Sequence, residues 1–307
     1  MTPKQKANIL SEALPYIQAY HGKTVVVRFG GAAMADDALK EGFARDVALL
    51  RLIGVKPVIV HGGGWRIDEL MRQMGLESRR RNGVRITDER TLTVVEMALG
   101  EINQELTGLI NKHGARAVGL DGQDGRFIHA RRLSADSGAP SGDREDLGFV
   151  GDVESIDTGL IELLLARNFI PVVMPVGVGA DGTAYHIDSD LLAGKLALAL
   201  DAETLIVMTN GEPVQDASGK PAYILTASEA EALLSQRLLA ETVARRLASA
   251  LKAVREGLQS VHIIDGGVPS AVLLELLTAE GVGTAVRSDK GPHFLEDSRA
   301  YLLSNEA

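Results

Sequence analysis

Two pairs of glycines stand at the ends of short apolar runs, where their backbone N–H groups could bind an anion. Gly30 and Gly31 directly follow the mostly β-branched run 24–29, and Gly63 and Gly64 end the segment Val-Ile-Val-His-Gly-Gly-Gly. Glycines at the carboxyl end of a strand let the backbone approach a phosphate or carboxylate, and a helix that begins there adds its dipole. Turn formation alone explains many such pairs. Two pairs at the ends of successive strands favour a phosphate or carboxylate site.

A basic hairpin contains a residue that could bind a carboxylate. Arginines occupy positions 79–81, the dipeptide Asn82-Gly83 is typical of a hairpin turn, and Arg85 follows it. A run of like charges usually forms a solvated face, which is our interpretation of residues 79–81. Arg85 lies beyond the turn, and its planar guanidinium could point back toward the glycines and clamp a carboxylate.

Two aspartates and two histidines carry less specific signals. Asp188 and Asp190 stand at the start of a predicted helix, where aspartate is also an ordinary cap, so their spacing leaves a capping and a functional role equally open. His61 and His186 have no partner at metal-ligand spacing, so a structural role is the default for both. We predict no protein-built metal site.

Two further glycine patterns resemble nucleotide-binding motifs without meeting their requirements. Residues 177–182 fit the pattern G-x-G-x-x-G, but the Thr-Ala-Tyr-His that follows does not open a helix. Gly22-Lys23-Thr24 is similar to the end of a P-loop, but position 17 is isoleucine and no strand precedes it. We therefore predict neither a dinucleotide fingerprint nor a P-loop.

The composition excludes several classes of protein. Asp and Glu number 41 against 32 Lys and Arg, and the net charge of −9 argues against a partner bound through a nucleic-acid backbone. The absence of cysteine excludes disulfides, zinc–thiolate sites and thiol nucleophiles. The longest apolar stretch, 169–180, is too short and too rich in Pro and Gly to span a bilayer, and no signal peptide opens the chain. We expect a cytoplasmic protein with no nucleic-acid and no membrane partner.

Short β-branched runs alternate with helical periodicity from residue 24 onward. The pattern predicts strands at 24–29, 57–61, 115–120, 126–132, 148–155, 170–176, 203–208, 260–264 and 283–287. It predicts helices at 36–53, 65–75, 88–113, 157–168, 188–200, 227–257 and 269–278, and a polar loop at 134–147. Such alternation indicates an α/β fold with a mainly parallel sheet and helices on both faces.

A further amphipathic helix precedes the first strand. Within residues 4–20, the apolar side chains Ile9, Leu10, Leu14 and Ile17 recur at helical spacing. An apolar face outside the first βαβ unit needs a surface to pack on. The pattern leaves open whether that surface belongs to the same chain or to a neighbouring subunit.

Together these segments resemble the acetylglutamate kinases of the amino-acid kinase family over almost the full length. The resemblance rests on Ala-Asn-Ile-Leu-Ser-Glu-Ala-Leu-Pro-Tyr-Ile, Val-Ile-Val-His-Gly-Gly-Gly, Asn-Gly-Val-Arg-Ile-Thr-Asp, Gly-Phe-Val-Gly-Asp-Val, Ile-Pro-Val-Val-Met-Pro-Val-Gly-Val and Val-His-Ile-Ile-Asp-Gly-Gly-Val-Pro-Ser. It implies an open αβα sandwich, the amino-acid kinase fold. It also implies an activity in arginine biosynthesis, in which the γ-phosphoryl group of ATP moves to the side-chain carboxylate of N-acetylglutamate and Mg²⁺ is carried by the nucleotide.

The resemblance also implies a division of labour along the chain. Residues 1–22 would form an oligomerisation helix, 23–180 the lobe that binds the acylated amino acid, and 181–307 the nucleotide-binding lobe. The N-terminal helix looks like that of the arginine-inhibited members, where it interlaces dimers into a hexameric ring. We therefore expect a homo-oligomer, a dimer formed through the sheet and possibly a hexamer formed through this helix.

Carried over by position, the glycines take specific roles. Gly63 and Gly64 would bind the substrate through backbone N–H groups, and Arg85 would clamp its α-carboxylate. Gly30 and Gly31 would face the phosphoryl group in transfer.

The catalytic positions depart from the family pattern. Arg28 and Arg246 stand where the family has its two catalytic lysines, and Asn210 replaces the aspartate after the nucleotide strand. Asp190, the acidic organiser of the catalytic cations, is kept. Arginine keeps the charge of lysine but is a broad planar fork, so it is not a conservative replacement at a phosphoryl group.

The substrate side departs as well. His186 and Asp188 replace the two asparagines of an Asn-x-Asn-Ala-Asp run, and Glu241 lies where a Ser-Gly-Gly-Met turn is expected. Three functions remain open: an N-acetylglutamate kinase that works through arginines, an enzyme of the same fold whose acceptor carries a donor group for His186 and Asp188, and a non-catalytic regulatory paralogue.

Overall fold

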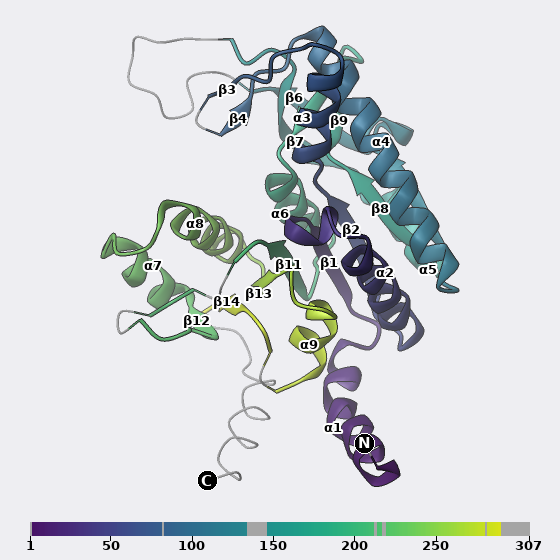
Figure 1. Ribbon diagram of the computed structural model, residues 1–307, viewed down its shortest axis with the longest axis vertical. Helices are drawn as coiled ribbons and strands as arrows, with labels where there is room; N and C mark the ends of the chain where they lie inside the picture. Colours follow the sequence, from purple (N-terminus) through teal and green to yellow (C-terminus); the bar gives the residue numbers. More distant parts are fainter. Residues whose placement is uncertain are drawn as a thin grey trace. The chain divides into compact units, whose positions relative to one another are not determined.

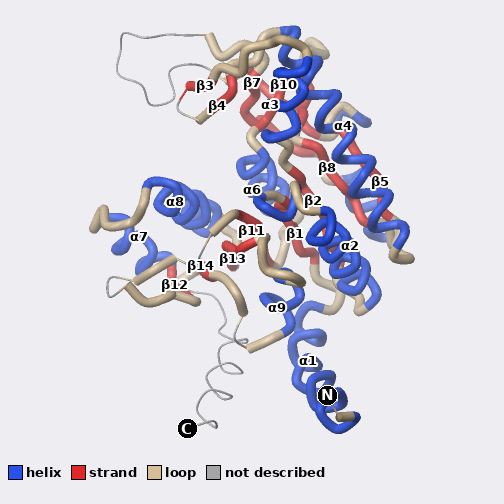
Figure 2. The backbone as a smooth tube through the Cα atoms, viewed as in Figure 1, coloured by secondary structure: helices blue, strands red, loops and turns tan. Residues whose placement is uncertain are grey.

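A computed structural model of the chain describes residues 2–81, 83–133, 146–211, 214–216, 219–279 and 281–289. The predicted turn residue Asn82 and most of the predicted loop 134–147 lie outside these ranges. The chain splits into two compact units (Figures 1 and 2). Unit 1 comprises Met1–Pro57 and Leu200–Ala307, and unit 2 comprises Val58–Ala199. These two units are defined by their compactness and not by the ligands that they bind. The division into an oligomerisation helix (1–22), an acceptor lobe (23–180) and a nucleotide lobe (181–307) therefore stays a prediction.

Unit 1 is built on a mainly parallel sheet. Its strands lie in the order β12 (Ile224–Thr226), β14 (Thr284–Arg287), β13 (Ser260–Asp265), β11 (Thr204–Thr209) and β1 (Thr24–Phe29). β1, β11 and β13 pair in parallel, whereas β13 and β14 pair in antiparallel. The β-branched residues Val25, Val26 and Val27 are fully buried, as expected for a strand covered on both faces.

Helices cover this sheet on two sides (Figure 1). The helices of unit 1 are α1 (Pro3–Tyr20), α2 (Asp37–Leu52), α7 (Ala227–Ser235), α8 (Glu241–Arg255) and α9 (Ala271–Leu277), with a 3₁₀ turn, η1 (Gly31–Met34). α8 packs against β13, β14 and α7, while α9 packs against β13, α2 and α1. Thr226 and Glu229 form a reciprocal capping box that starts α7.

Unit 2 contains a second set of parallel strands, in the order β2 (Lys56–His61), β8 (Ile170–Met174) and β5 (Ala117–Asp121). Its helices are α3 (Gly64–Gln73), α4 (Glu89–Lys112), α5 (Gly159–Ala166) and α6 (Ser189–Ala199). The long helix α4 runs along β8 and β5 (Figure 2) and contacts α3. Asp88 caps α4 by accepting a hydrogen bond of 2.8 Å from the Thr91 backbone N–H.

Unit 2 also carries a small closed barrel of four strands and a short hairpin. The barrel consists of β6 (Ile128–Arg132), β7 (Val150–Ile156), β9 (Val176–Val178) and β10 (Ala184–Ile187), and a 3₁₀ turn, η2 (Asp124–Arg126), precedes β6. The hairpin pairs β3 (Arg80–Arg81) with β4 (Val84–Arg85) in antiparallel, on either side of the predicted turn.

The predicted fold class, α/β with a mainly parallel central sheet, is confirmed, and the differences are local. The run 170–176 forms two strands that part at Pro175, a residue with no N–H for a ladder. The predicted helix 227–257 is two helices. β10 and β12 are missed because three or four residues are too few to show a period. Residues 177–182 comprise the end of β9 and its turn into β10, and they open no helix. The Gly179 N–H closes this turn by donating a hydrogen bond to the Thr183 carbonyl.

Candidate functional site

Five predicted residues gather at the carboxyl ends of β1 and β11 in unit 1. Gly31 has φ +74°, and a Cβ there would lie 2.6 Å from the Asn210 side-chain oxygen and from the Thr209 carbonyl oxygen. A Cβ on Gly30 would lie 1.8 Å from Nη1 of Arg28. Gly31 therefore requires glycine, because its φ is left-handed and the Thr209 backbone leaves no room for a Cβ, whereas a Cβ on Gly30 would mainly displace the end of the Arg28 side chain. The backbone of this turn lies directly against Asn210 and Arg28.

Both arginines that stand at lysine positions reach the same strand end. Nη1 of Arg28 donates a hydrogen bond of 3.0 Å to the Met208 carbonyl oxygen. Nη1 of Arg246, which projects from α8, donates a hydrogen bond of 2.7 Å to the Asn210 carbonyl oxygen. Two guanidinium groups are thus held within two residues of each other along β11, beside the Gly30–Gly31 turn. We name Arg28, Gly30, Gly31, Asn210 and Arg246 the strand-end cluster.

A cavity of about 380 Å³ adjoins this cluster. It is lined by Asn210, Arg246 and residues from the start of α8, among them Thr242 and Val243. Ala240, the N-cap residue of α8, has no side-chain oxygen that could cap the helix. The N–H groups of its first turn, together with the helix dipole, therefore suit a phosphate group. Glu241, in that first turn, is exposed and brings a negative charge to the same end of the helix.

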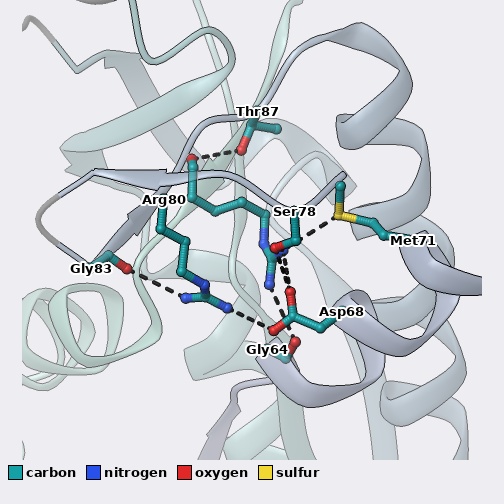
Figure 3. A network of polar contacts seen from close by, with 8 residues as sticks. Gly64, Asp68, Met71, Ser78, Arg80, Gly83 and Thr87 are labelled. Atoms are coloured by element: carbon teal, nitrogen blue, oxygen red, sulfur yellow. Dashed lines mark hydrogen bonds and ion pairs between the residues drawn. The ribbon is translucent and has the colours of Figure 1, made fainter. Parts of the chain in front are cut away.

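Arg85 anchors the second group of residues, which lies in unit 2 (Figure 3). Its side chain is only 2% exposed. Nη1 donates hydrogen bonds of 2.6 Å to a carboxylate oxygen of Asp68 and to the Ser78 hydroxyl, and Nη2 donates one of 3.2 Å to the Gly64 carbonyl oxygen. Arg85 therefore holds the first turn of α3 and its Gly64 backbone in place.

Arg80 belongs to the same network, although the sequence pattern predicted a solvated surface charge at this position. Its Nη2 donates a hydrogen bond of 2.9 Å to the other carboxylate oxygen of Asp68. Figure 3 shows the Arg80 guanidinium and the Asp68 carboxylate beside Gly64. Arg80 pairs directly opposite Arg85 across the hairpin, so their side chains share one face. The run of arginines does not by itself indicate that Arg80 and Arg85 share a face. The two-residue turn after Arg81 fixes the register of the hairpin and could have revealed this pairing.

Asp68 balances both guanidinium groups. Partial burial raises the pKa of its carboxyl group, but the hydrogen bonds from Arg85 and Ser78 and the charges of Arg85 and Arg80 outweigh burial and lower the pKa to about 2. Arg80 is 43% exposed and Arg85 is buried. Of the two guanidinium groups, that of Arg80 is therefore the one open to a ligand.

His186 and Asp188 belong to the same electrostatic neighbourhood. Burial, together with the positive charges of Arg85 and Arg80, outweighs the opposing effect of Asp188 and lowers the pKa of His186 to about 4. His186 is therefore neutral at pH 7 and offers one donor and one acceptor. Asp188 is exposed and caps α6, because its Oδ1 accepts hydrogen bonds of 2.9 Å from the backbone N–H groups of Asp190 and Leu191.

The remaining predicted residues flank these groups. Asp190 lies half-buried in the first turn of α6. A Cβ on Gly63 would lie 2.8 Å from the Leu99 side chain, so packing against α4 by itself favours glycine there. His61 is buried, and its ring nitrogens contact the Gly62 carbonyl and the Asn103 amide, which confirms its structural role. The described part of the chain contains no cluster of three His, Cys, Asp or Glu side chains that could hold a metal ion.

Comparisons with known proteins show the family to which the chain belongs. Residues 23–265 match the Amino acid kinase family. The chain is a member of the amino acid kinase family. This is the family that the sequence motifs resemble. Among the described residues, no helix is long and apolar enough to cross a membrane.

Relatives within the amino acid kinase family cover nearly the whole chain. An acetylglutamate kinase of Chromobacterium violaceum is 51% identical over 286 residues, which cover 92% of this chain and 98% of that protein. An acetylglutamate kinase of Nitrosospira multiformis is 49% identical over 286 residues, which cover 93% and 98%.

Solved structures share the amino acid kinase fold. An N-acetylglutamate synthase of Neisseria gonorrhoeae, complexed with coenzyme A and N-acetyl-glutamate, superposes with a TM-score of 0.81 at 26% identity. The match covers 92% of this chain but only 63% of the synthase chain, so this protein spans less than two thirds of that enzyme. A carbamate kinase of Giardia lamblia, bound to AMP-PNP, has a TM-score of 0.61 at 18% identity, which shows a shared fold alone.

Proposed function

We propose that this protein is an ATP-dependent phosphotransferase of the acetylglutamate kinase type, which moves the γ-phosphoryl group of ATP to the side-chain carboxylate of N-acetylglutamate. The strand-end cluster carries the proposal, because two guanidinium groups and a glycine turn meet at one point. The names of the relatives that are 51% and 49% identical to this chain support the same substrate.

The strand-end cluster suits the donor phosphates. ATP would occupy the cavity beside Asn210, with its phosphates at the uncapped start of α8 and Arg246 beside them. Phosphoryl transfer depends mainly on positioning and charge neutralisation, which Arg28, Arg246 and the backbone N–H groups of Gly30 and Gly31 can provide. Mg²⁺ would arrive on the nucleotide phosphates and neutralise part of their charge.

The network around Arg85 suits the acceptor. A carboxylate at the start of α3 would meet the backbone N–H groups of Gly63 and Gly64 and the open guanidinium of Arg80. Arg85 would act mainly by holding the Gly64 backbone and Asp68, since its side chain is only 2% exposed. Neutral His186 can donate or accept one hydrogen bond at this site. As an ATP-dependent enzyme of amino-acid biosynthesis, the protein would work in the cytoplasm.

The direct test is to detect the acyl phosphate. Purified protein is incubated with Mg-ATP, N-acetylglutamate and hydroxylamine. Hydroxylamine converts an acyl phosphate into a hydroxamate, which is detected as a coloured complex. N-acetylglutamine, which lacks the side-chain carboxylate, is the matched control. We expect hydroxamate only with N-acetylglutamate. Calorimetry with ATP alone separates the other outcomes: ATP binding without hydroxamate rejects this acceptor and favours a changed one, and absence of both rejects the kinase activity.

A changed acceptor is the second candidate, and the exposed carboxylate of Asp188 favours it. This negative charge lies near a site that would otherwise take a dicarboxylate, and uncompensated like charges cost several kcal/mol. An acceptor with an N–H or ammonium group could pair with Asp188 instead. The two candidates therefore predict opposite effects of removing this charge.

We expect Asp188→Asn to lower the KM for N-acetylglutamate about tenfold, because like-charge repulsion is removed. Asparagine keeps the oxygen that caps α6, so stability should change by only a few tenths of a kcal/mol. Initial rates of ADP release at varied acceptor concentration measure the effect. Asp181→Asn is the control, since Asp181 is an exposed aspartate that likewise accepts a backbone hydrogen bond two residues along. A raised KM would favour an acceptor that pairs with Asp188.

We also propose that α1 joins subunits into a larger ring. Ile9, Leu10 and Leu14 are 51%, 73% and 51% exposed, whereas Tyr16 and Tyr20 near the end of α1 are buried. The first three side chains form an apolar face that a neighbouring subunit could cover.

Removal of residues 1–20 should reduce a hexamer to dimers, because the apolar face of α1 is lost. Light scattering measures the mass. As a control that keeps the helix, Ile9, Leu10 and Leu14 are replaced together by glutamate, which should give the same dimer. An unchanged mass in both variants would exclude α1 from the interface.

A further inference from the structure

A carboxylate is buried in α2, and neither proposed substrate uses it. Asp46 is only 2% exposed. Its Oδ1 accepts a hydrogen bond of 3.2 Å from the Ser270 hydroxyl, which is its one side-chain hydrogen bond among the described residues. Burial raises the pKa of Asp46 to about 6, although the bond from Ser270 and the charge of Arg45 lower it. At pH 7 the group is still mostly ionised, and a buried charge with one hydroxyl partner is costly.

Asp46 and Ser270 line a cavity of about 170 Å³ in unit 1. Most of its wall is apolar, with Leu39 and Phe43 from α2 and Val268 and Val272 from the start of α9. A cavity of about 150 Å³ with apolar walls can hold one benzene ring. The cavity beside Asp46 is therefore large enough for a five-membered ring or a short alkyl chain.

The shape of the chain at Ser270 keeps this cavity open. Ser270 has φ 56° in the left-handed region, and its side chain does not cap α9. Its hydroxyl turns to Asp46 instead. Serine is too small to fill the space, and it offers no positive charge to the carboxylate.

We propose that the Asp46 cavity binds a small organic cation with an N–H donor, such as an imidazolium or a short primary ammonium ion. The cation would donate a hydrogen bond to the Asp46 carboxylate and bury its C–H groups against Leu39, Phe43 and Val272. Anions are excluded by like charge. Hydrated inorganic cations are disfavoured because apolar walls cannot replace their water, and they prefer several oxygen ligands. Gly266, which also lines the cavity, lies against the Gly30 carbonyl, so an occupant would adjoin the strand-end cluster.

Imidazole is the probe, titrated at pH 7 into the full-length protein and followed by calorimetry and thermal shift. We expect saturable binding that stabilises the protein. Asp46→Asn should weaken it at least about tenfold, because the charge partner is lost. Asp37→Asn, which changes an exposed carboxylate of the same helix, should leave imidazole affinity unchanged.

Ser270→His supplies a second, independent arm. A histidine at this position places a tethered imidazole against Asp46, so we expect it to abolish binding of free imidazole and to raise Tm. Benzene tests whether the cavity is only apolar. Equal binding of imidazole to wild type, Asp46→Asn and Ser270→His would overturn the proposal, and so would binding of benzene but not imidazole. None of these readouts depends on kinase activity, so they stand apart from the test of the proposed function.

Discussion

Asp68→Asn should destabilise the protein by about 3 kcal/mol at pH 7, the low end of the range for breaking a buried ion pair by removing one partner. The reason lies in Arg85, whose side chain is 2% exposed and bonds to Asp68 at 2.6 Å. Without the carboxylate, a buried guanidinium keeps its charge but loses its counter-charge. The low end is appropriate because Asp68 itself is 41% exposed, so water reaches the pair.

The pH dependence identifies the cause. The pKa of Asp68 is 3.8 in its unperturbed state and about 2 in the folded protein, so the folded state favours the ionised form. The stabilisation by Asp68 is therefore fully present above pH 3.8 and is lost as the pH falls toward 2. Urea titrations of wild type and Asp68→Asn should differ most above about pH 5 and converge only as the pH falls to about 2.

A neighbouring carboxylate on the same helix provides the control. Glu69 pairs with Arg66 at the surface, and such exposed pairs contribute about 0–1 kcal/mol. Glu69→Gln should therefore change the free energy of unfolding far less than Asp68→Asn does. Equal effects of the two variants would mean that the Arg85 network is not a buried ion pair in energetic terms.

Arg28→Met and Arg246→Met should each lower kcat about 100- to 1000-fold, the typical loss when one well-placed donor to a reacting group is removed. Both guanidinium groups are anchored to carbonyl oxygens at the end of β11, beside the Gly30–Gly31 turn. Methionine keeps an unbranched chain but carries no charge. The measurement is ADP release at saturating Mg-ATP and acceptor, with Tm recorded to exclude unfolding. A kcat within threefold of wild type for both variants would remove these arginines from the phosphoryl path.

Lysine variants separate charge from shape. Arg28→Lys combined with Arg246→Lys keeps both positive charges but replaces each planar fork with a compact ammonium group. A rise in kcat would mean that the arginines are poor substitutes for lysine. An unchanged or lower kcat would mean that the site is built around arginine, since each guanidinium would then need both its bond to β11 and its reach toward the phosphates.

The local sequence pattern was sufficient to predict the longer helices and strands and the positions that need glycine. The strands 24–29 and 260–264 and the helix 88–113 lie within a few residues of their predicted ends, because β-branched runs and helical apolar spacing act within one element. Gly31 has a left-handed φ and its backbone lies against Asn210, as expected of a residue that needs glycine, while its place at an anion site stays a prediction. Neither β10 nor β12 could be predicted, because three or four residues are too few to show a period.

The α/β class, the glycine turns and membership of the amino acid kinase family follow from residue order and local backbone preference. Which polar groups meet depends on how the elements pack together. Arg28 and Arg246 are 218 positions apart by their numbers and converge on one strand end, and Asp46 meets Ser270 across 224 positions. The hairpin turn alone could place Arg80 opposite Arg85, but the bond of Arg80 to Asp68 depends on how α3 packs beside the hairpin. Such contacts depend on register and packing between elements, and no local periodicity in the chain encodes them.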